Sequence, residues 1–158
     1  MKARKVKLDP DARLDESLRA ILVVRIDELH SFDPSNPGEL HDLRIAAKRV
    51  RYILEAAAPV FGEPAARGVE TMKQVQDLLG EIHDCDELLP LLDRHTKRLR
   101  SEDAAAAAAK KPLPNRRKYR GLEALRAQTV AERERLYKRF VRKWPKVDVE
   151  LPHAGVVA

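Results

Sequence analysis

The sequence predicts an all-α protein, folded as an antiparallel four-helix bundle. Four segments carry apolar residues at spacings of three and four, and no segment alternates as a strand bounded by turns would. The 158 residues are 44% hydrophobic and 35% charged, a balance that is typical of amphipathic helices and too apolar for a wholly disordered chain. The length fits one domain with enough chain to bury a core.

The first two helices are predicted from apolar stripes and from a helix-start signal between them. The first helix is expected from about Asp9-Pro10 to His30, with the stripe Leu14, Leu18, Ile21, Leu22, Ile26, Leu29 and Phe32. The segment Asn36-Pro37-Gly38-Glu39 then supplies an N-cap, a proline at the first helical position and a glutamate three residues after the cap. The second helix is expected to run to about Phe61, with the stripe Leu40, Leu43, Ala47, Val50, Leu54, Ala57 and Phe61.

The third and fourth helices are predicted on either side of a long linker. The third begins near Pro64, and Pro90 is expected to kink or break it because proline lacks the amide donor. Residues 101–119 are predicted to form a basic loop, and the fourth helix is expected over about 120–144. The predicted organisation is a basic N-terminal tail over 1–9, a helical bundle over 10–144 and a C-terminal tail over 145–158.

The net charge of +6 comes from 31 Lys and Arg against 25 Asp and Glu. Ten of the 31 basic residues lie in two segments without any acid, residues 1–8 and 110–120, so the rest of the chain has a net charge of −4. A basic composition is therefore poor evidence for a binding surface, and such a surface has to be shown by placing residues on helix faces.

The compartment is predicted from what the sequence lacks. No apolar run approaches the roughly 20 residues that a membrane span needs, and the basic start has no apolar stretch of the signal-peptide kind. We therefore expect a cytoplasmic protein without membrane contact. The single Cys85 excludes an internal disulfide and a cysteine-based zinc site, and we expect neither a metal nor a cofactor.

One flank of the second helix carries a row of cations about 120° from its apolar stripe. The row follows spacings of three and four over about 15 Å of helix and consists of His41, Arg44, Lys48 and Arg51. Glu55 closes the row, and Arg49 and Tyr52 lie at its margin. Such a row suits a polyanion, because arginine holds two phosphate oxygens at once. A solvated basic face is the alternative interpretation.

A polar strip on the third helix complements this row. It recurs at three and four and consists of Lys73, Gln76, Gly80, Asp84 and Glu87. A glycine inside a helix costs about 1 kcal/mol relative to alanine. Gly80 therefore indicates either a close approach of another backbone, from the second helix or a second subunit, or a tolerated glycine. Arg25 and Arg133 lie on or near apolar stripes, and we expect them to reach the surface or pair with acids, unless they extend the anion site.

Two blocks of the sequence resemble a known family. The block Leu40 to Tyr52, LHDLRIAAKRVRY, resembles the signature helix of CHAD domains, the conserved-histidine α-helical domains. The block Lys73 to Asp84, KQVQDLLGEIHD, resembles the following helix of that family. The resemblance spans roughly 10–144, but only these two blocks, in order and about 30 residues apart, are specific.

The resemblance implies non-enzymatic binding of inorganic polyphosphate in a basic channel, often at polyphosphate granules. By motif position, the implied polyphosphate contacts are His41, Arg44, Lys48, Arg49, Arg51 and Lys73. The implied supporting residues are Tyr52, Gln76 and Asp84. The usual domain has two four-helix halves, whereas this chain has one signature helix. We therefore expect a single half that forms a twofold homodimer and rebuilds the channel from two copies.

Two other classes of function stay open from the residues. A nucleic-acid-binding module is compatible with the basic loop, although three Phe, three Tyr and one Trp provide few stacking platforms. A metal phosphohydrolase of the His-Asp type is suggested by His41-Asp42 and His83-Asp84, and a phosphotransfer bundle by His41. Adjacent residues on a helix point about 100° apart, so each His-Asp pair needs further ligands from elsewhere.

Overall fold

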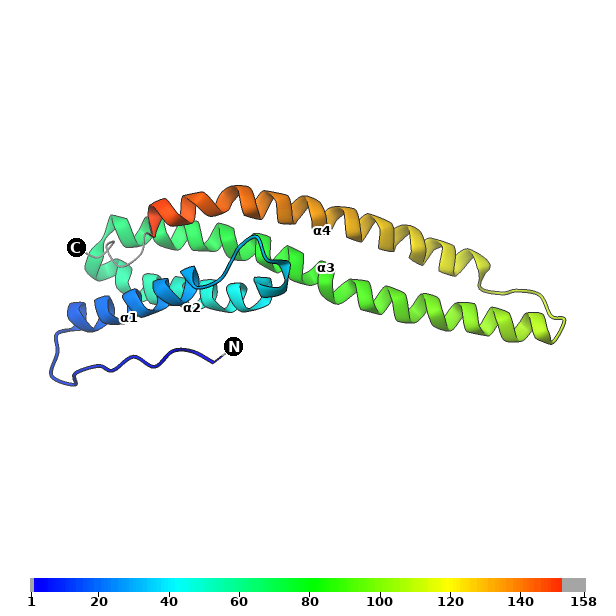
Figure 1. Cartoon of the computed structure of the whole chain (residues 1–158), viewed down its shortest axis with the longest axis horizontal. Helices are drawn as coiled ribbons and strands as arrows, with labels where there is room; N and C mark the ends of the chain where they lie inside the picture. Colours follow the sequence, from blue (N-terminus) through cyan, green and yellow to red (C-terminus); the bar gives the residue numbers. More distant parts are fainter. Residues whose placement is uncertain (1, 152–158) are drawn as a thin grey trace. The chain divides into compact units, whose positions relative to one another are not determined.

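The computed structural model describes residues 2–151 and consists of helices joined by short connections (Figure 1). The elements are α1 (Leu14–His30), a 3₁₀ turn (Pro37–Glu39), α2 (Leu40–Phe61), α3 (Glu63–Ala108) and α4 (Arg116–Glu150). No strand occurs among residues 2–151, and the predicted all-α class is confirmed.

The described chain forms two compact units. The first, called here the bundle unit, comprises residues 2–80 and 139–151 and contains α1, α2, the start of α3 and the end of α4. The second, called here the hairpin, comprises residues 81–138.

The bundle unit is organised around one apolar core to which all four helical segments contribute. The predicted stripe of α2 is buried at every position except Phe61, which is half-buried. In the predicted stripe of α1, Leu18, Leu22, Ile26 and Leu29 are buried, whereas Ile21 and Phe32 are half-buried. Leu14 is 67% exposed because it lies in the first turn, outside the core. The largest side chains enclosed in this core include Leu22, Leu29, Leu43, Val50, Met72, Val75, Leu79 and Phe140.

The connection between α1 and α2 follows the predicted helix-start signal. The Asn36 side chain accepts a hydrogen bond from the backbone N–H of Gly38 and donates one from its amide to Glu39. It caps the 3₁₀ turn, which leads directly into α2. At the other end of α2, Gly62 adopts a positive φ of 65°, which glycine tolerates without the penalty that a β-carbon brings.

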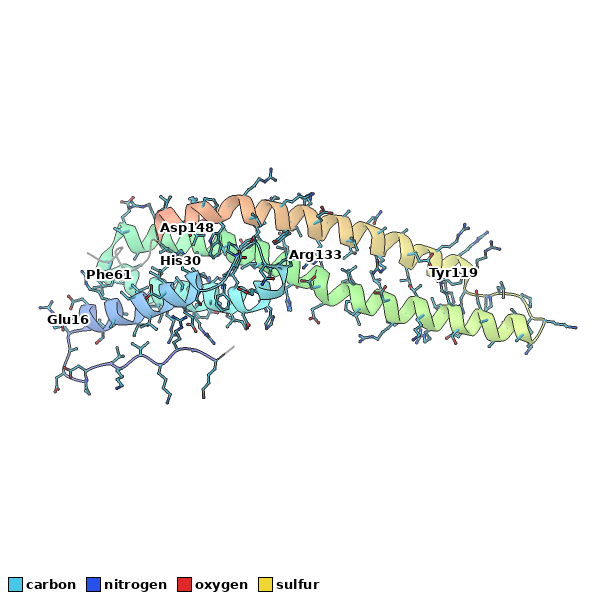
Figure 2. All side chains as sticks on the ribbon, viewed as in Figure 1. Glu16, His30, Phe61, Tyr119, Arg133 and Asp148 are labelled. Atoms are coloured by element: carbon cyan, nitrogen blue, oxygen red, sulfur yellow. The ribbon has the colours of Figure 1, made fainter. Side chains whose placement is uncertain are left out.

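The end of α4 corrects the prediction of a tail from residue 145. The helix continues through Pro145 to Glu150, and residues 152–158 of the predicted tail lie outside the described residues. The His30 ring lies 2.7 Å from the carbonyl oxygen of Leu151, and its Nδ1 lies 3.4 Å from Asp148 Oδ1 (Figure 2). Leu151 is itself buried, so these contacts with α1 stabilise the last turn despite the proline.

The hairpin consists of residues 81–108 of α3 and 116–138 of α4. Its ion pairs join Asp86 to Arg133, Asp93 to Arg126 and Arg100 to Glu123, and this order shows that the two segments are antiparallel. The expected break at Pro90 is wrong. Proline has no N–H to donate to the backbone carbonyl oxygen four residues earlier in the helix. Because Pro90 lies on an exposed face, water can hydrogen-bond to that oxygen instead, and the helix continues.

The loop of the hairpin is shorter than the predicted 101–119. The six alanines extend α3 to Ala108 because alanine has the highest helix propensity, and α4 begins at Arg116. Asn115 precedes α4, and its backbone N–H donates to Asp103 Oδ1 at 3.0 Å in a buried position. This bond ties the start of α4 to the end of α3, which local sequence rules do not anticipate.

Candidate anion-binding site

The cationic row of α2 keeps its register because α2 is one helix of 22 residues. The buried positions Leu43, Val50 and Leu54 face the core of the bundle unit. His41 and Lys48 are exposed, whereas Arg44 and Arg51 are half-buried. The row therefore lies at the edge of the core, with its charged ends accessible to a ligand.

Arg44 is a cation that the fold leaves unneutralised. Its guanidinium forms no ion pair with any residue of 2–151, and its Nε is enclosed without a hydrogen-bond acceptor. An enclosed donor without a partner costs free energy, so this N–H favours an acceptor supplied from outside the chain. Within the same described range, the Lys48 and Lys73 ammonium groups also lack a carboxylate partner.

Tyr52 orders the exposed end of the row. The Lys48 Nζ atom lies 5.6 Å from the centroid of the Tyr52 ring, and the Arg51 Cζ atom lies 5.0 Å from it. Arg51 also donates from its Nη1 to Glu55 at 3.0 Å, while its Nε is enclosed without a partner. The ring and the carboxylate thus hold two cations next to each other, which fits the supporting role implied for Tyr52.

Arg49 lies apart from the row, in a network centred on a buried carboxylate. Its Nη1 donates at 3.1 Å to Glu28, which is only 2% exposed. Arg25 donates to the other oxygen of Glu28 at 2.5 Å, which confirms the expected pairing of Arg25 with an acid. Two guanidinium groups therefore share one carboxylate.

The same network holds the N-terminal segment. The backbone N–H of Arg4 donates to Glu28 at 3.2 Å, and the backbone oxygen of Arg4 accepts from Arg25 at 2.6 Å. The segment expected as a tail is thus bonded to α1, and Figure 1 shows it running along that helix. This role of Glu28 was not predicted, although a glutamate inside an apolar stripe, three residues after an arginine, indicates a buried ion pair.

The polar strip of the third helix is divided between the two units. Lys73 is exposed and Gln76 is half-buried in the bundle unit, whereas Asp84 is an exposed residue of the hairpin. The expected close approach at Gly80 is absent within the described chain, because a β-carbon there would have no neighbour within 4 Å. Gly68 is the closely packed glycine instead, with Leu54 and Leu151 atoms 3.1 Å from the position of a β-carbon.

Two further residues considered from the sequence belong to the hairpin. Arg133 pairs with Asp86, and this hydrogen bond raises the pKa of the guanidinium. Cys85 is half-buried, and burial, followed by the charges of Glu132 and Asp86, raises the pKa of its thiol. The thiol is therefore protonated at neutral pH and a weak nucleophile.

Across residues 2–151, no three His, Cys, Asp or Glu side chains gather closely enough to hold a metal ion. In the same part of the chain, no helix combines the length and the apolar character that crossing a membrane requires.

The comparisons with known proteins identify the family. The model of the CHAD domain matches residues 3–93, more than half of the chain, and this range contains both blocks quoted above. It includes the N-terminal segment and ends in the hairpin, so the matched range starts earlier and ends earlier than the expected 10–144. Neither the curated proteins nor the solved structures that were compared include a match. The chain belongs to the CHAD-domain family.

Proposed function

We propose that this protein binds inorganic polyphosphate without chemical conversion, through the cationic row of α2. The observation that carries the proposal is the unneutralised state of Arg44 and Lys48, in a molecule where the Arg25, Arg49 and Arg67 side chains are all paired with carboxylates. The CHAD domain is linked to polyphosphate binding, which supports a polyanion as the ligand. Association with polyphosphate granules is part of this proposal.

The geometry of the row suits a linear polyanion. Polyphosphate carries about one negative charge per phosphate unit, so cations at successive helical turns can meet phosphate groups spaced along its length. His41, Arg44, Lys48 and Arg51 provide donors at each turn of a rigid helix. Binding releases counterions, so the affinity should fall with salt with a log–log slope of about −0.7 per contact, by analogy with single-stranded nucleic acids.

The remaining implied contacts have different surroundings. Lys73 is exposed in the bundle unit, so its ammonium group is accessible to a ligand. Arg49 already bonds Glu28, and its part in binding would be to keep the local potential positive. The chain contains one signature helix, and we propose that a second copy supplies the other side of the channel.

The test compares two variants that lose the same charge. In the first, Arg44, Lys48 and Arg51 are replaced by glutamine. In the control, three exposed arginines that already pair with carboxylates are replaced in the same way; they are Arg13, Arg67 and Arg100. Binding of long-chain polyphosphate is measured by fluorescence anisotropy across a salt series, with helicity followed by circular dichroism.

We expect the row variant to bind far more weakly than the wild type and the magnitude of its salt slope to fall by about 2, which corresponds to three contacts. The control should bind with nearly the wild-type affinity, because it removes charge but no contact. Equal affinities for the two variants would contradict the proposal. So would RNA or DNA that outcompetes polyphosphate at equal phosphate concentration, since that result assigns the row to nucleic acid.

A further inference from the structure

The hairpin exposes apolar side chains that the proposed binding function does not use. Of its 58 residues, only Ile82, Leu92 and Leu136 are buried hydrophobic residues. Five large hydrophobic residues of the hairpin are 36–45% exposed, namely Leu88, Leu91, Leu113, Leu125 and Val130. Two paired helices with this much apolar surface in water favour a further partner.

Part of this surface forms an open groove between the two helices. The groove has a volume of about 310 Å³ and is lined by Asp84, Cys85, Leu88, Gln128, Thr129 and Glu132. Most of its exposed lining is apolar, and two acidic residues, Asp84 and Glu132, also line it. The groove is therefore suited to another protein surface on which apolar side chains are flanked by cations.

The face that contains the groove has an ordered pattern along both helices. On α3 the spacing of four and three continues from the groove through Asp84, Leu88, Leu91, His95 and Arg98. On α4 the corresponding residues are Lys118, Gly121, Leu125, Gln128 and Glu132. Because the helices are antiparallel, Asp84 and Glu132 make one end of this face acidic, and Arg98 and Lys118 make the other end basic. The middle of the face is apolar and contains Leu88, Leu91 and Leu125.

The charges of the whole hairpin are distributed in the same way as those of this face, with one acidic half and one basic half. The half formed by 81–93 and 126–138 has seven Asp and Glu against four Lys and Arg. The other half, residues 94–125, has three Asp and Glu against ten Lys and Arg. Asp84 and Lys118 form no ion pair with any residue of 2–151. One half therefore carries negative charge that complements the positive charge of the other.

We propose that the hairpin is the surface through which two copies of this chain associate, with the two hairpins antiparallel about a twofold axis. In this arrangement, the acidic half of each copy faces the basic half of the other. The exposed leucines Leu88, Leu91 and Leu125 lie close to the boundary between the halves, where the axis passes, so they meet the same residues of the second copy. A parallel pairing would place like charges together.

The dimensions of the hairpin are sufficient for such a dimer. On α3, residues 81–93 and 94–108 each extend for about 20 Å at 1.5 Å per residue, so the two halves overlap completely. A face of about 40 Å by 20 Å offers about 800 Å² per copy, which is the area that a standard stable interface buries per partner.

The association through the hairpins depends neither on polyphosphate binding nor on a second copy completing the channel at α2. The first test uses sedimentation velocity on the full chain between 1 and about 100 µM. The variant Leu88→Glu/Leu91→Glu places two carboxylates in the middle of the face. The control Leu14→Glu/Val60→Glu makes the same change at two exposed apolar residues of the bundle unit. Circular dichroism checks that all three proteins have the same helicity.

We expect the wild type and the control to sediment as dimers, and the hairpin variant to sediment as a monomer, with association weakened at least 100-fold. A monomeric wild type overturns the inference, and so does a hairpin variant that stays dimeric. A control that becomes monomeric also overturns it, because the interface then lies on the bundle unit. A monomeric wild type that still binds polyphosphate would leave the binding function standing.

A second test uses the charge pattern. The variant Asp84→Lys/Glu132→Lys makes both ends of the face basic, and Arg98→Glu/Lys118→Glu makes both ends acidic. We expect each variant alone to be monomeric and an equimolar mixture to form a heterodimer, because the charges then match again. Either variant remaining dimeric alone, or a mixture that fails to associate, contradicts the arrangement.

Discussion

The bundle unit and the hairpin are both built from long helices, but different forces stabilise them. Of the 23 buried hydrophobic residues in the range 2–151, the bundle unit contains 20 and the hairpin three. Ion pairs between the hairpin helices, such as Asp93–Arg126, lie in water, where each contributes less than about 1 kcal/mol. The comparison indicates that the bundle unit depends on its own core, whereas the hairpin depends on helix propensity and on what covers its apolar face.

The largest expected difference concerns the same change at two acidic residues. In the bundle unit, Glu28→Ala removes the buried carboxylate that two guanidinium groups share, and we expect a loss of about 3 kcal/mol of unfolding free energy. In the hairpin, Asp93→Ala removes an exposed partner of Arg126, and the loss should be below about 1 kcal/mol.

Urea unfolding followed by circular dichroism measures both losses. In addition, Glu28→Ala should release the N-terminal segment, which faster proteolysis near Arg4 would report. Equal losses for the two variants would mean that Glu28 is not the centre of a buried network.

A smaller difference is expected for valine-to-alanine changes. Val50 is fully buried in the bundle unit, and Val50→Ala should cost about 2 kcal/mol through lost apolar burial and a residual cavity. Val130 is 40% exposed in the hairpin, and Val130→Ala should be neutral or slightly stabilising, because alanine is the better helix former. Thermal unfolding at one protein concentration measures both. A Val130→Ala loss as large as that of Val50→Ala would show that the hairpin has a core of its own.

The smallest effects, of opposite sign, are expected at two glycines of α3. A β-carbon at Gly68 would lie 3.1 Å from Leu54 and Leu151 side-chain atoms, so Gly68→Ala should cost about 1 kcal/mol through overpacking. A β-carbon at Gly80 meets nothing within 4 Å, so Gly80→Ala should stabilise the protein by about 0.5–1 kcal/mol. Differential scanning calorimetry distinguishes the two signs. Destabilisation by Gly80→Ala would instead indicate that another backbone, such as that of a second subunit, approaches there.

The elements that were predicted best are those whose signals are local. The α2 helix follows a 3₁₀ turn that Asn36 caps, repeats its apolar residues at the helical period and ends at a glycine, so its core and its flank both followed from spacing. The C-terminal ends of α3 and α4 were predicted wrongly, because the rule that proline ends a helix takes account of the proline alone and not of the contacts that the surrounding turns make. Pro90 and Pro145 lie within helices whose neighbouring turns are stabilised by pairing with other segments.

The sequence by itself determined the all-α class, the apolar stripe of α2 and the order of cations along its flank, because helical periodicity converts spacing directly into faces. Arg51 pairs with Glu55 one turn along the same helix, but tertiary structure alone decided that Arg49 is neutralised and that Arg44 is not. Arg49 is held by Glu28, a residue of another helix, and Arg44 is left without a partner in the described chain. The reason is physical: an ion pair depends on distance and burial between segments that are far apart in sequence, and no local pattern encodes either.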